Sequence, residues 1–236
     1  MAIVDICADL PSIPYPLASN QDLESGVKTL TSYGGKTMGF VCDVRIESQV
    51  KMSVEKVIED FGHLDILVNN AGVVSLSTID QLSETAWDEV LDVCLKGVYL
   101  CCKHAINHMK GRRCGKIVNI SSIAGLRGLG LLGHYCAAKH GVLGLTRALA
   151  METADHNINV NAVCPGTVES PSLLGLADQA NLDTEAYEHF SSAHLFKDRR
   201  ITPEDVAGAV RWLVSEESRS ITGAIINVDA GWSAKG

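Results

Sequence analysis

Short apolar runs alternate with longer stretches of helical periodicity along this chain. The apolar runs are rich in Val and Ile and lack clean alternation, which is typical of strands covered on both faces. The expected strands are Ala2–Ile6, Thr37–Val41, Ile66–Asn69, Lys116–Ile120, Asn157–Val163 and Ala224–Val228. The expected helices span about 20–32, 47–61, 84–111, 134–155 and 203–215. This alternation predicts right-handed β-α-β units and an α/β fold with a doubly wound, Rossmann-like parallel sheet.

Two segments fall outside the regular alternation, although no linker, repeat or low-complexity stretch divides the chain. Residues 1–236 are therefore expected to form a single domain. Asp9–Asn20 carries three prolines and is expected to be an ordered loop or a short cover. Residues 170–195 leave a strand end, where ligands sit in doubly wound folds, so they are a candidate substrate lid. A plain surface excursion is the alternative for that segment.

Composition and charge narrow the classes of partner. The net charge is −8, from 28 acidic and 20 basic residues, so binding to nucleic acid is not expected. No run of about 18 apolar residues and no signal peptide are present, which favours a cytoplasmic protein without a membrane partner. The eight cysteines are scattered and form no C-x-x-C pair, so we expect reduced, mostly buried thiols and no metal site.

Candidate chemistry begins with Tyr135 and Lys139, which lie four residues apart in a helical pattern and so share one helix face. An ammonium group beside a phenol favours the phenolate, and a tyrosine tuned in this way can act as a general acid or base. Such a pair alone is weak evidence, because two such residues on a helix usually decorate a surface.

Three further signals each follow a predicted strand. Ser122 comes just after Lys116–Ile120, Asn69-Asn70-Ala71-Gly72 ends the strand that begins at Ile66, and Pro165-Gly166-Thr167-Val168 follows Asn157–Val163. Because parallel strands end at the same edge of a sheet, these segments should gather there. A serine hydroxyl at that edge could hold a substrate oxygen.

The order Asn-Asn-Ala-Gly, Ser, Tyr-x-x-x-Lys and Pro-Gly resembles the short-chain dehydrogenase/reductase family, and the resemblance covers nearly the whole chain through Gly223–Trp232. The resemblance implies that Tyr135 is the catalytic acid/base and that Ser122 orients the substrate oxygen. It implies that Lys139 binds the nicotinamide ribose and lowers the tyrosine pKa. The other residues that it places around the cofactor are Asp43 and Val44 at the adenine, Asn70, Ala71 and Gly72 along the cleft, and Pro165, Gly166, Val168 and Ser170 at the nicotinamide.

Asp5 ends the first predicted strand. A carboxylate at that place can accept both ribose hydroxyls of NAD and would repel the 2′-phosphate of NADP, so NAD is the expected cofactor. The alternative is a solvent-facing aspartate that opens a loop. The loop that follows contains Pro-Ser-Ile-Pro-Tyr-Pro and resembles the carveol-dehydrogenase-like subgroup, which is linked with a tightly held nicotinamide and with the redox partner mycofactocin.

The sequence departs from the family pattern in two places. Members begin with a strand and a T-G-x-x-x-G-x-G turn, whose backbone N–H groups hold the pyrophosphate, and no such glycine cluster precedes Asp5. We therefore expect the first strand and the phosphate-binding turn to be missing and cofactor binding to be weak or lost. The second departure is Cys94, which stands where members commonly have an asparagine, and a small buried hydrophobe is the favoured interpretation.

These observations favour hydride transfer between NAD(H) and a hydrophobic secondary alcohol or ketone, with Tyr135 moving the proton. The alternatives are a cofactor-deficient binding or assembly protein and a non-redox lyase or isomerase. The apolar helical patterns at about 84–111 and 134–155 would need cover on two sides, so a homodimer or homotetramer is expected.

Overall fold

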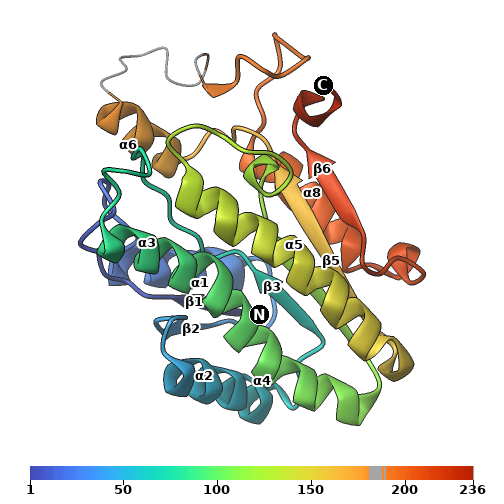
Figure 1. The fold of residues 1–236 in the computed structure, drawn as a ribbon. Helices are drawn as coiled ribbons and strands as arrows, with labels where there is room; N and C mark the ends of the chain where they lie inside the picture. The colour runs from blue at the N-terminus through green and yellow to red at the C-terminus, as the bar shows by residue number, and fades with distance from the viewer. Residues whose placement is uncertain (181–187, 189, 236) are drawn as a thin grey trace.

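The computed structural model describes residues 1–180, 188 and 190–235. Within these residues the strands are all parallel and divide into two sheets (Figure 1). The strands are β1 (Ala2–Asp5), β2 (Met38–Val41), β3 (Ile66–Asn69), β4 (Gly115–Ile120), β5 (Ile158–Pro165) and β6 (Ile225–Val228). One sheet holds β1 and β2, and the other has the order β3-β4-β5-β6. The expected parallel α/β arrangement is confirmed, although its strands form two sheets. The expected loss of a first strand stays a prediction.

The helices begin and end close to the predicted positions. They are α1 (Asn20–Ser32), α2 (Glu47–Phe61), α3 (Glu84–Leu91), α4 (Gly97–Arg112), α5 (Gly133–Thr153), α6 (Pro171–Gln179) and α8 (Pro203–Leu213). The start of α1 is fixed by a capping box in which Ser19 and Asp22 bond each other's backbone N–H. The helix predicted at about 84–111 is wrong in one respect, because a π-helical turn over Asp92–Lys96 separates α3 from α4. Helical periodicity does not reveal such a turn, which is common at functional sites.

The four-stranded sheet is covered on both faces, as its apolar strands predicted. On one face, Ile117 and Val160 pack with Val98 and Met109 of α4 and Val142 of α5. On the opposite face, Val118 and Val163 pack against Leu213 of α8. The alternation from Ile117 to Val118 is the two-residue period of a strand, so β4 contributes to both cores.

Five of the eight free cysteines are buried, which confirms the expectation for most of them. Cys114 is exposed, and Cys7 and Cys101 are half-buried. Asp9–Asn20 is an ordered connection that buries Leu10, Ile13 and Tyr15, as predicted for a loop with three prolines. In the described part of the chain, no helix combines the length and the apolar character that crossing a membrane requires.

Candidate functional site

Three candidate side chains come from the turn after β4 and from helix α5: Ser122, Tyr135 and Lys139. Ser122 follows the carboxyl end of β4, while Tyr135 and Lys139 lie in the first two turns of α5. The Ser122 hydroxyl accepts the Ala124 N–H at 3.1 Å and so begins a short 3₁₀ turn. The Ser122 side chain also lies near Tyr135 and lowers the pKa of its phenol. The structure therefore brings the serine and the tyrosine together at the predicted edge.

Lys139 is almost completely buried, with 3% of its surface exposed. Its ammonium donates to the Ile120 carbonyl at 2.8 Å and lies 5.4 Å from the centre of the Tyr135 ring. A buried ammonium is costly unless it is bonded, so the end of β4 holds this lysine in place. The cation consequently lies on the tyrosine side of the sheet edge.

Burial raises the pKa of Tyr135, and the nearby Cys94 thiol raises it further, while the hydrogen bond with Ser122 opposes the shift. In this structure burial sets the direction of the Tyr135 pKa, and the expectation that Lys139 lowers it stays a prediction. The physical reason is that Lys139 spends a hydrogen bond on Ile120 and faces the ring at 5.4 Å, while desolvation acts directly on the phenolate. Tyr135 is thus a neutral phenol at pH 7 in this structure.

Close backbone approach fixes the turn after β4 against α5. The Ser121 hydroxyl donates to the Lys139 carbonyl at 2.9 Å. A methyl group on Gly125 would lie 2.5 Å from Ser121 Oγ and 2.7 Å from the Lys139 carbonyl oxygen. Only glycine fits there, because any Cβ would push the turn away from the helix that carries the catalytic candidates.

The segment after β3 lies beside this pair. Asn70, Ala71 and Gly72 are exposed, and a methyl group on Gly72 would lie 3.6 Å from Lys139 Nζ. The exposed stretch therefore lies next to the buried ammonium. This placement agrees with the prediction that the strand ends gather.

Cys94 lies in the π-helical turn and is fully buried. Its sulfur accepts the Val73 N–H at 3.4 Å and donates to the Val73 carbonyl at 3.3 Å. The interpretation as a small buried hydrophobe is correct for burial but misses this pair of weak hydrogen bonds. The thiol ties the segment after β3 to the helix that follows it.

The segment after β5 forms the far side of the site. Pro165 is buried at the end of β5, and the Gly166 N–H donates to the Val228 carbonyl at 2.9 Å. Val168 forms an isolated bridge with Ile201, and Ser170 is the N-cap of α6. The candidate lid at 170–195 thus begins with a helix, while 181–187 and 189 lie outside the described residues.

The residues predicted around the adenosine lie on the smaller sheet. Asp5 ends β1, and one of its carboxylate oxygens accepts the Cys7 N–H at 2.8 Å. Asp43 follows β2, and its carboxylate pairs with the Arg45 guanidinium at 2.7–3.0 Å. Burial opposes ionisation of Asp43, but the bonds from Arg45 hold the pKa of that carboxyl below its usual range. Val44 packs against Gly97, where a methyl group would lie 2.7 Å from its Cγ2.

Three polar contacts near the site were not predicted from the sequence. Glu89 is buried and accepts the Ser12 N–H at 3.0 Å. The Tyr15 hydroxyl accepts the Val74 N–H at 3.0 Å, and Tyr15 shares an apolar cluster with Tyr135. The position of Tyr15 between two prolines was the one sequence signal for its contact with Val74. No local pattern in the sequence indicated the role of Glu89.

His134 provides the third contact and directly precedes Tyr135. It is fully buried, and its Nε2 lies 3.1 Å from Ser75 Oγ. Among the described residues, its Nδ1 has no hydrogen-bond partner. Burial lowers the pKa of this imidazole, so the ring is neutral near pH 7. The pair joins the segment after β3 to the first turn of α5.

The nicotinamide–ribose half of a dinucleotide fits these residues. Asn70, Ala71 and Gly72 present an exposed strand end beside the Lys139 ammonium, which is a hydrogen-bond donor suited to ribose hydroxyls. Ser122 and Tyr135 lie on the same side and offer the hydroxyl groups that an alcohol or carbonyl oxygen requires. The arrangement can therefore bind an oxygen-bearing substrate and exchange one proton with it.

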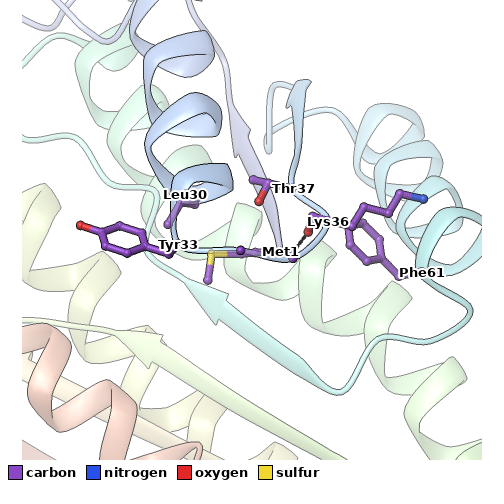
Figure 2. Close-up of a pocket in the computed structure, with 8 residues that line it drawn as sticks. Met1, Leu30, Tyr33, Lys36, Thr37 and Phe61 are labelled. Carbon is purple, nitrogen blue, oxygen red and sulfur yellow. Dashed lines mark hydrogen bonds between the residues drawn. The ribbon is translucent and has the colours of Figure 1, made fainter.

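A hollow at the opposite edge of the molecule contrasts with this site. It is lined by Met1, Leu30, Tyr33, Lys36 and Phe61, and Figure 2 shows the bond from the Met1 amino group to the Lys36 carbonyl. Met1 and Lys36 precede β1 and β2, so the hollow lies at the amino ends of these strands. Ligands of doubly wound folds bind at the carboxyl ends, so this hollow is separate from the candidate site.

Comparisons with known proteins agree with this geometry. The family model described as "Enoyl-(Acyl carrier protein) reductase" matches residues 17–233. The (−)-trans-carveol dehydrogenase of Rhodococcus erythropolis is 35% identical, over 99% of this chain and 88% of its own length. A 3-oxoacyl-(acyl-carrier-protein) reductase of Thermotoga maritima is 37% identical, over 90% of this chain and 84% of its own. The crystal structure of carveol dehydrogenase from Mycobacterium avium in complex with NAD superposes with a TM-score of 0.93 and is 32% identical, covering 99% of this chain and 88% of that one.

Proposed function

This chain belongs to the short-chain dehydrogenase/reductase family, and we propose that it transfers a hydride between NAD(H) and a hydrophobic secondary alcohol or ketone. The observation that carries the proposal is the contact of Tyr135 with Ser122 beside the buried ammonium of Lys139. Similarity to the carveol dehydrogenases supports an alcohol as the substrate class. The 1–236 domain would carry both the cofactor and the substrate.

The proposed mechanism assigns one task to each side chain. Ser122 holds the substrate oxygen, and Tyr135 gives a proton to a ketone or takes one from an alcohol. Lys139 holds the ribose hydroxyls, while Asn70, Ala71 and Gly72 line the cleft. When bound, the nicotinamide supplies or accepts the hydride and, in its oxidised form, adds a positive charge to the site.

The raised pKa of Tyr135 gives a direction to this proton transfer. A neutral phenol is ready to protonate a ketone at pH 7, whereas alcohol oxidation needs the phenolate. We expect the oxidation rate to rise with pH as the phenolate fraction grows and the reduction rate to fall. Initial rates in both directions, measured across a pH series at saturating cofactor, check this expectation. A flat profile in both directions would contradict the role of Tyr135.

The remaining cofactor assignments concern the two ends of the dinucleotide. Asp5 would accept the adenosine ribose hydroxyls through the carboxylate oxygen that Cys7 does not occupy, while Asp43 and Val44 would meet the adenine. Pro165, Gly166, Val168 and Ser170 would flank the nicotinamide. Because a carboxylate repels the 2′-phosphate, we expect Asp5 to favour NAD over NADP. Calorimetric titration with each dinucleotide tests this, and Asp5→Asn should narrow the difference.

The direct test of the proposed function is a steady-state assay with a panel of linear and cyclic secondary alcohols and the matching ketones. NAD is supplied for oxidation and NADH for reduction, and each reaction is followed by the absorbance of reduced nicotinamide. We expect turnover with at least one hydrophobic pair, at cofactor concentrations high enough to offset the weak NAD binding expected from the sequence. Failure on every pair, with calorimetric NAD binding intact, would overturn the substrate class but leave the cofactor assignment.

A second part of the proposal is self-association through α4 and α5. Both helices are long, and Tyr99 and Met151 remain 46% and 83% exposed on them. Apolar side chains of this size at the outer face of a helix favour a second copy as cover. Light scattering at micromolar concentration should give the mass of a dimer or tetramer, and a monomer would contradict it.

A further inference from the structure

The loop at residues 9–17, here called the proline loop, is closed at its ends and fastened to the body of the protein at its middle. Its first residue, Asp9, accepts the Leu17 N–H at 2.8 Å and so closes the loop on itself. In its middle, the backbone N–H and hydroxyl of Ser12 both donate to the buried Glu89 of α3. The proline loop therefore has a defined position relative to α3.

Tyr15 is the residue that this loop delivers to the site. Only 8% of its surface is exposed, and its hydroxyl accepts the Val74 N–H at 3.0 Å. Its ring belongs to the apolar cluster that also holds Ala138 and the Tyr135 ring. Burial raises the pKa of Tyr15 to about 12, and a further contribution from Tyr135 indicates that the two phenols are close. Tyr15 is thus a neutral phenol packed on the catalytic side of α5.

Helix α6 rests on the same ring. A methyl group on Gly175 would lie 2.3 Å from Tyr15 Cβ and 2.5 Å from its Cδ1, so the α6 backbone is in direct contact with Tyr15. The end of α6 is held separately, because the Gln179 amide bonds the Leu76 N–H at 2.8 Å and the Leu76 carbonyl at 3.0 Å. Ser170 is the N-cap residue of α6, and its side chain makes no capping hydrogen bond. Tyr15 therefore supports the middle of a helix whose carboxyl end is held by Leu76.

We propose that Tyr15 is a specificity-determining residue, which sets the distance of α6 from Tyr135 and so limits the width of the alcohol that the site accepts. The inference rests on the proposed function for its substrate, but the contact between Tyr15 and α6 does not. Val74 orients the ring through its hydroxyl, and Gly175 lets α6 approach to van der Waals distance. A smaller residue at position 15 would leave room beside Tyr135, whereas a larger residue at 175 would lift α6.

The first experiment measures the support of α6 without any activity. Hydrogen–deuterium exchange of the 171–179 peptide is compared in the parent chain, Tyr15→Ala, Tyr15→Phe and the control Tyr33→Ala. Tyr33 is an exposed tyrosine at the opposite edge, with 82% of its surface accessible. We expect the amides of α6 to exchange about tenfold faster in Tyr15→Ala, the lower end of the effect of one missing apolar contact. In Tyr15→Phe and Tyr33→Ala, the exchange rate should equal that of the parent chain. Unchanged exchange in a folded Tyr15→Ala would overturn the support of α6 by Tyr15.

The second experiment measures selectivity as the ratio of kcat/KM for a bulky bicyclic alcohol to that for 2-butanol. Removing the ring should raise this ratio by about tenfold or more, the scale of one apolar group in a binding pocket. Gly175→Ala places a methyl group against Tyr15 and lifts α6, so it should raise the ratio as well. Tyr15→Phe keeps the ring and should give the parental ratio. A ratio that stays parental while exchange of α6 rises would overturn the specificity role. If the parent oxidises no alcohol, the proposed function fails, and the exchange result alone decides whether Tyr15 supports α6.

Discussion

The two inner strands of the four-stranded sheet differ sharply in burial from the two-stranded sheet, whereas the edge strand β3 resembles the latter, with Ile66 43% and Val68 40% exposed. In β4 and β5, Ile117, Val118, Val160 and Val163 have no exposed surface. In β1 and β2, by contrast, Val4 is 39% exposed and Val41 is 61% exposed. The four-stranded sheet has helices on both faces, whereas the sheet of β1 and β2 lies at the periphery of the apolar clusters.

The difference separates the two tasks of the proposed enzyme. Ser122, Tyr135 and Lys139 are carried by β4 and α5, the most buried scaffold of the molecule. Asp5 and Asp43, the candidates for adenosine binding, end the two exposed strands. A scaffold with little room to relax keeps reacting groups within a fraction of an ångström, which proton transfer requires. We infer that catalytic geometry is rigid in this chain and that the adenosine side is the more adaptable half.

The largest expected effect comes from Tyr135→Phe, which tests the rigid half. The change removes one hydroxyl and keeps the ring, so packing with Tyr15 and Ala138 is preserved. General acid–base catalysis contributes about 10²–10⁴-fold, so kcat should fall by that order. Steady-state kinetics with the best alcohol of the panel measures it, and the melting temperature serves as control. More than half of the activity remaining at an unchanged melting temperature would refute the assigned role.

A second prediction compares stability in the two halves. Asn119 is fully buried on β4, where it accepts a bond from Asn69 at 2.8 Å and donates one to Thr146 at 2.9 Å. Asn119→Ala removes two buried hydrogen bonds, which should lower the free energy of unfolding by about 1–3 kcal/mol. Val41→Ala on β2 should change it by less than about 0.5 kcal/mol, as is usual for exposed positions.

Chemical denaturation of the parent and both variants measures the two free energies. The first variant loses two buried hydrogen bonds and the second loses two exposed methyl groups, so the comparison contrasts a buried with an exposed strand position. Equal losses in the two variants would mean that β2 is held as firmly as β4, and the distinction between a rigid and an adaptable half would be wrong.

Most of the fold could be predicted from the sequence, because covered parallel strands read as continuous apolar runs. Ile66–Asn69 begins and ends as predicted, and the edges of the other strands differ by one or two residues. The meeting of strand ends near Lys139 also followed from the topology alone. The division into two sheets agrees with one expectation, since loss of the family's first strand, which lies in the middle of the sheet, would leave unpaired edges on both of its neighbours.

Contacts between distant segments account for what the sequence missed. Ser12 and Glu89 are 77 residues apart, and Leu76 and Gln179 are 103 apart, so no local pattern relates them. The net direction of the Tyr135 pKa in this structure was not predictable for a similar reason. Sequence spacing showed that Lys139 shares its helix face, but it could not show that the ammonium bonds Ile120 or that burial outweighs its charge.

The smallest expected effect concerns His134, at the junction of the rigid half with the segment after β3. Burial lowers the pKa of its imidazole from 6.5 in the folded chain. A group with a lowered folded pKa releases stability as pH falls, because the unfolded chain binds the proton first. The free energy of unfolding should therefore decline from about pH 6.5 downwards, and His134→Gln should decline less steeply. His194, whose pKa is also lowered by burial, should keep part of the slope. Denaturant titrations between pH 7.5 and about 5 give these slopes, and identical slopes in His134→Gln and the parent would show that protonation of His134 does not oppose folding.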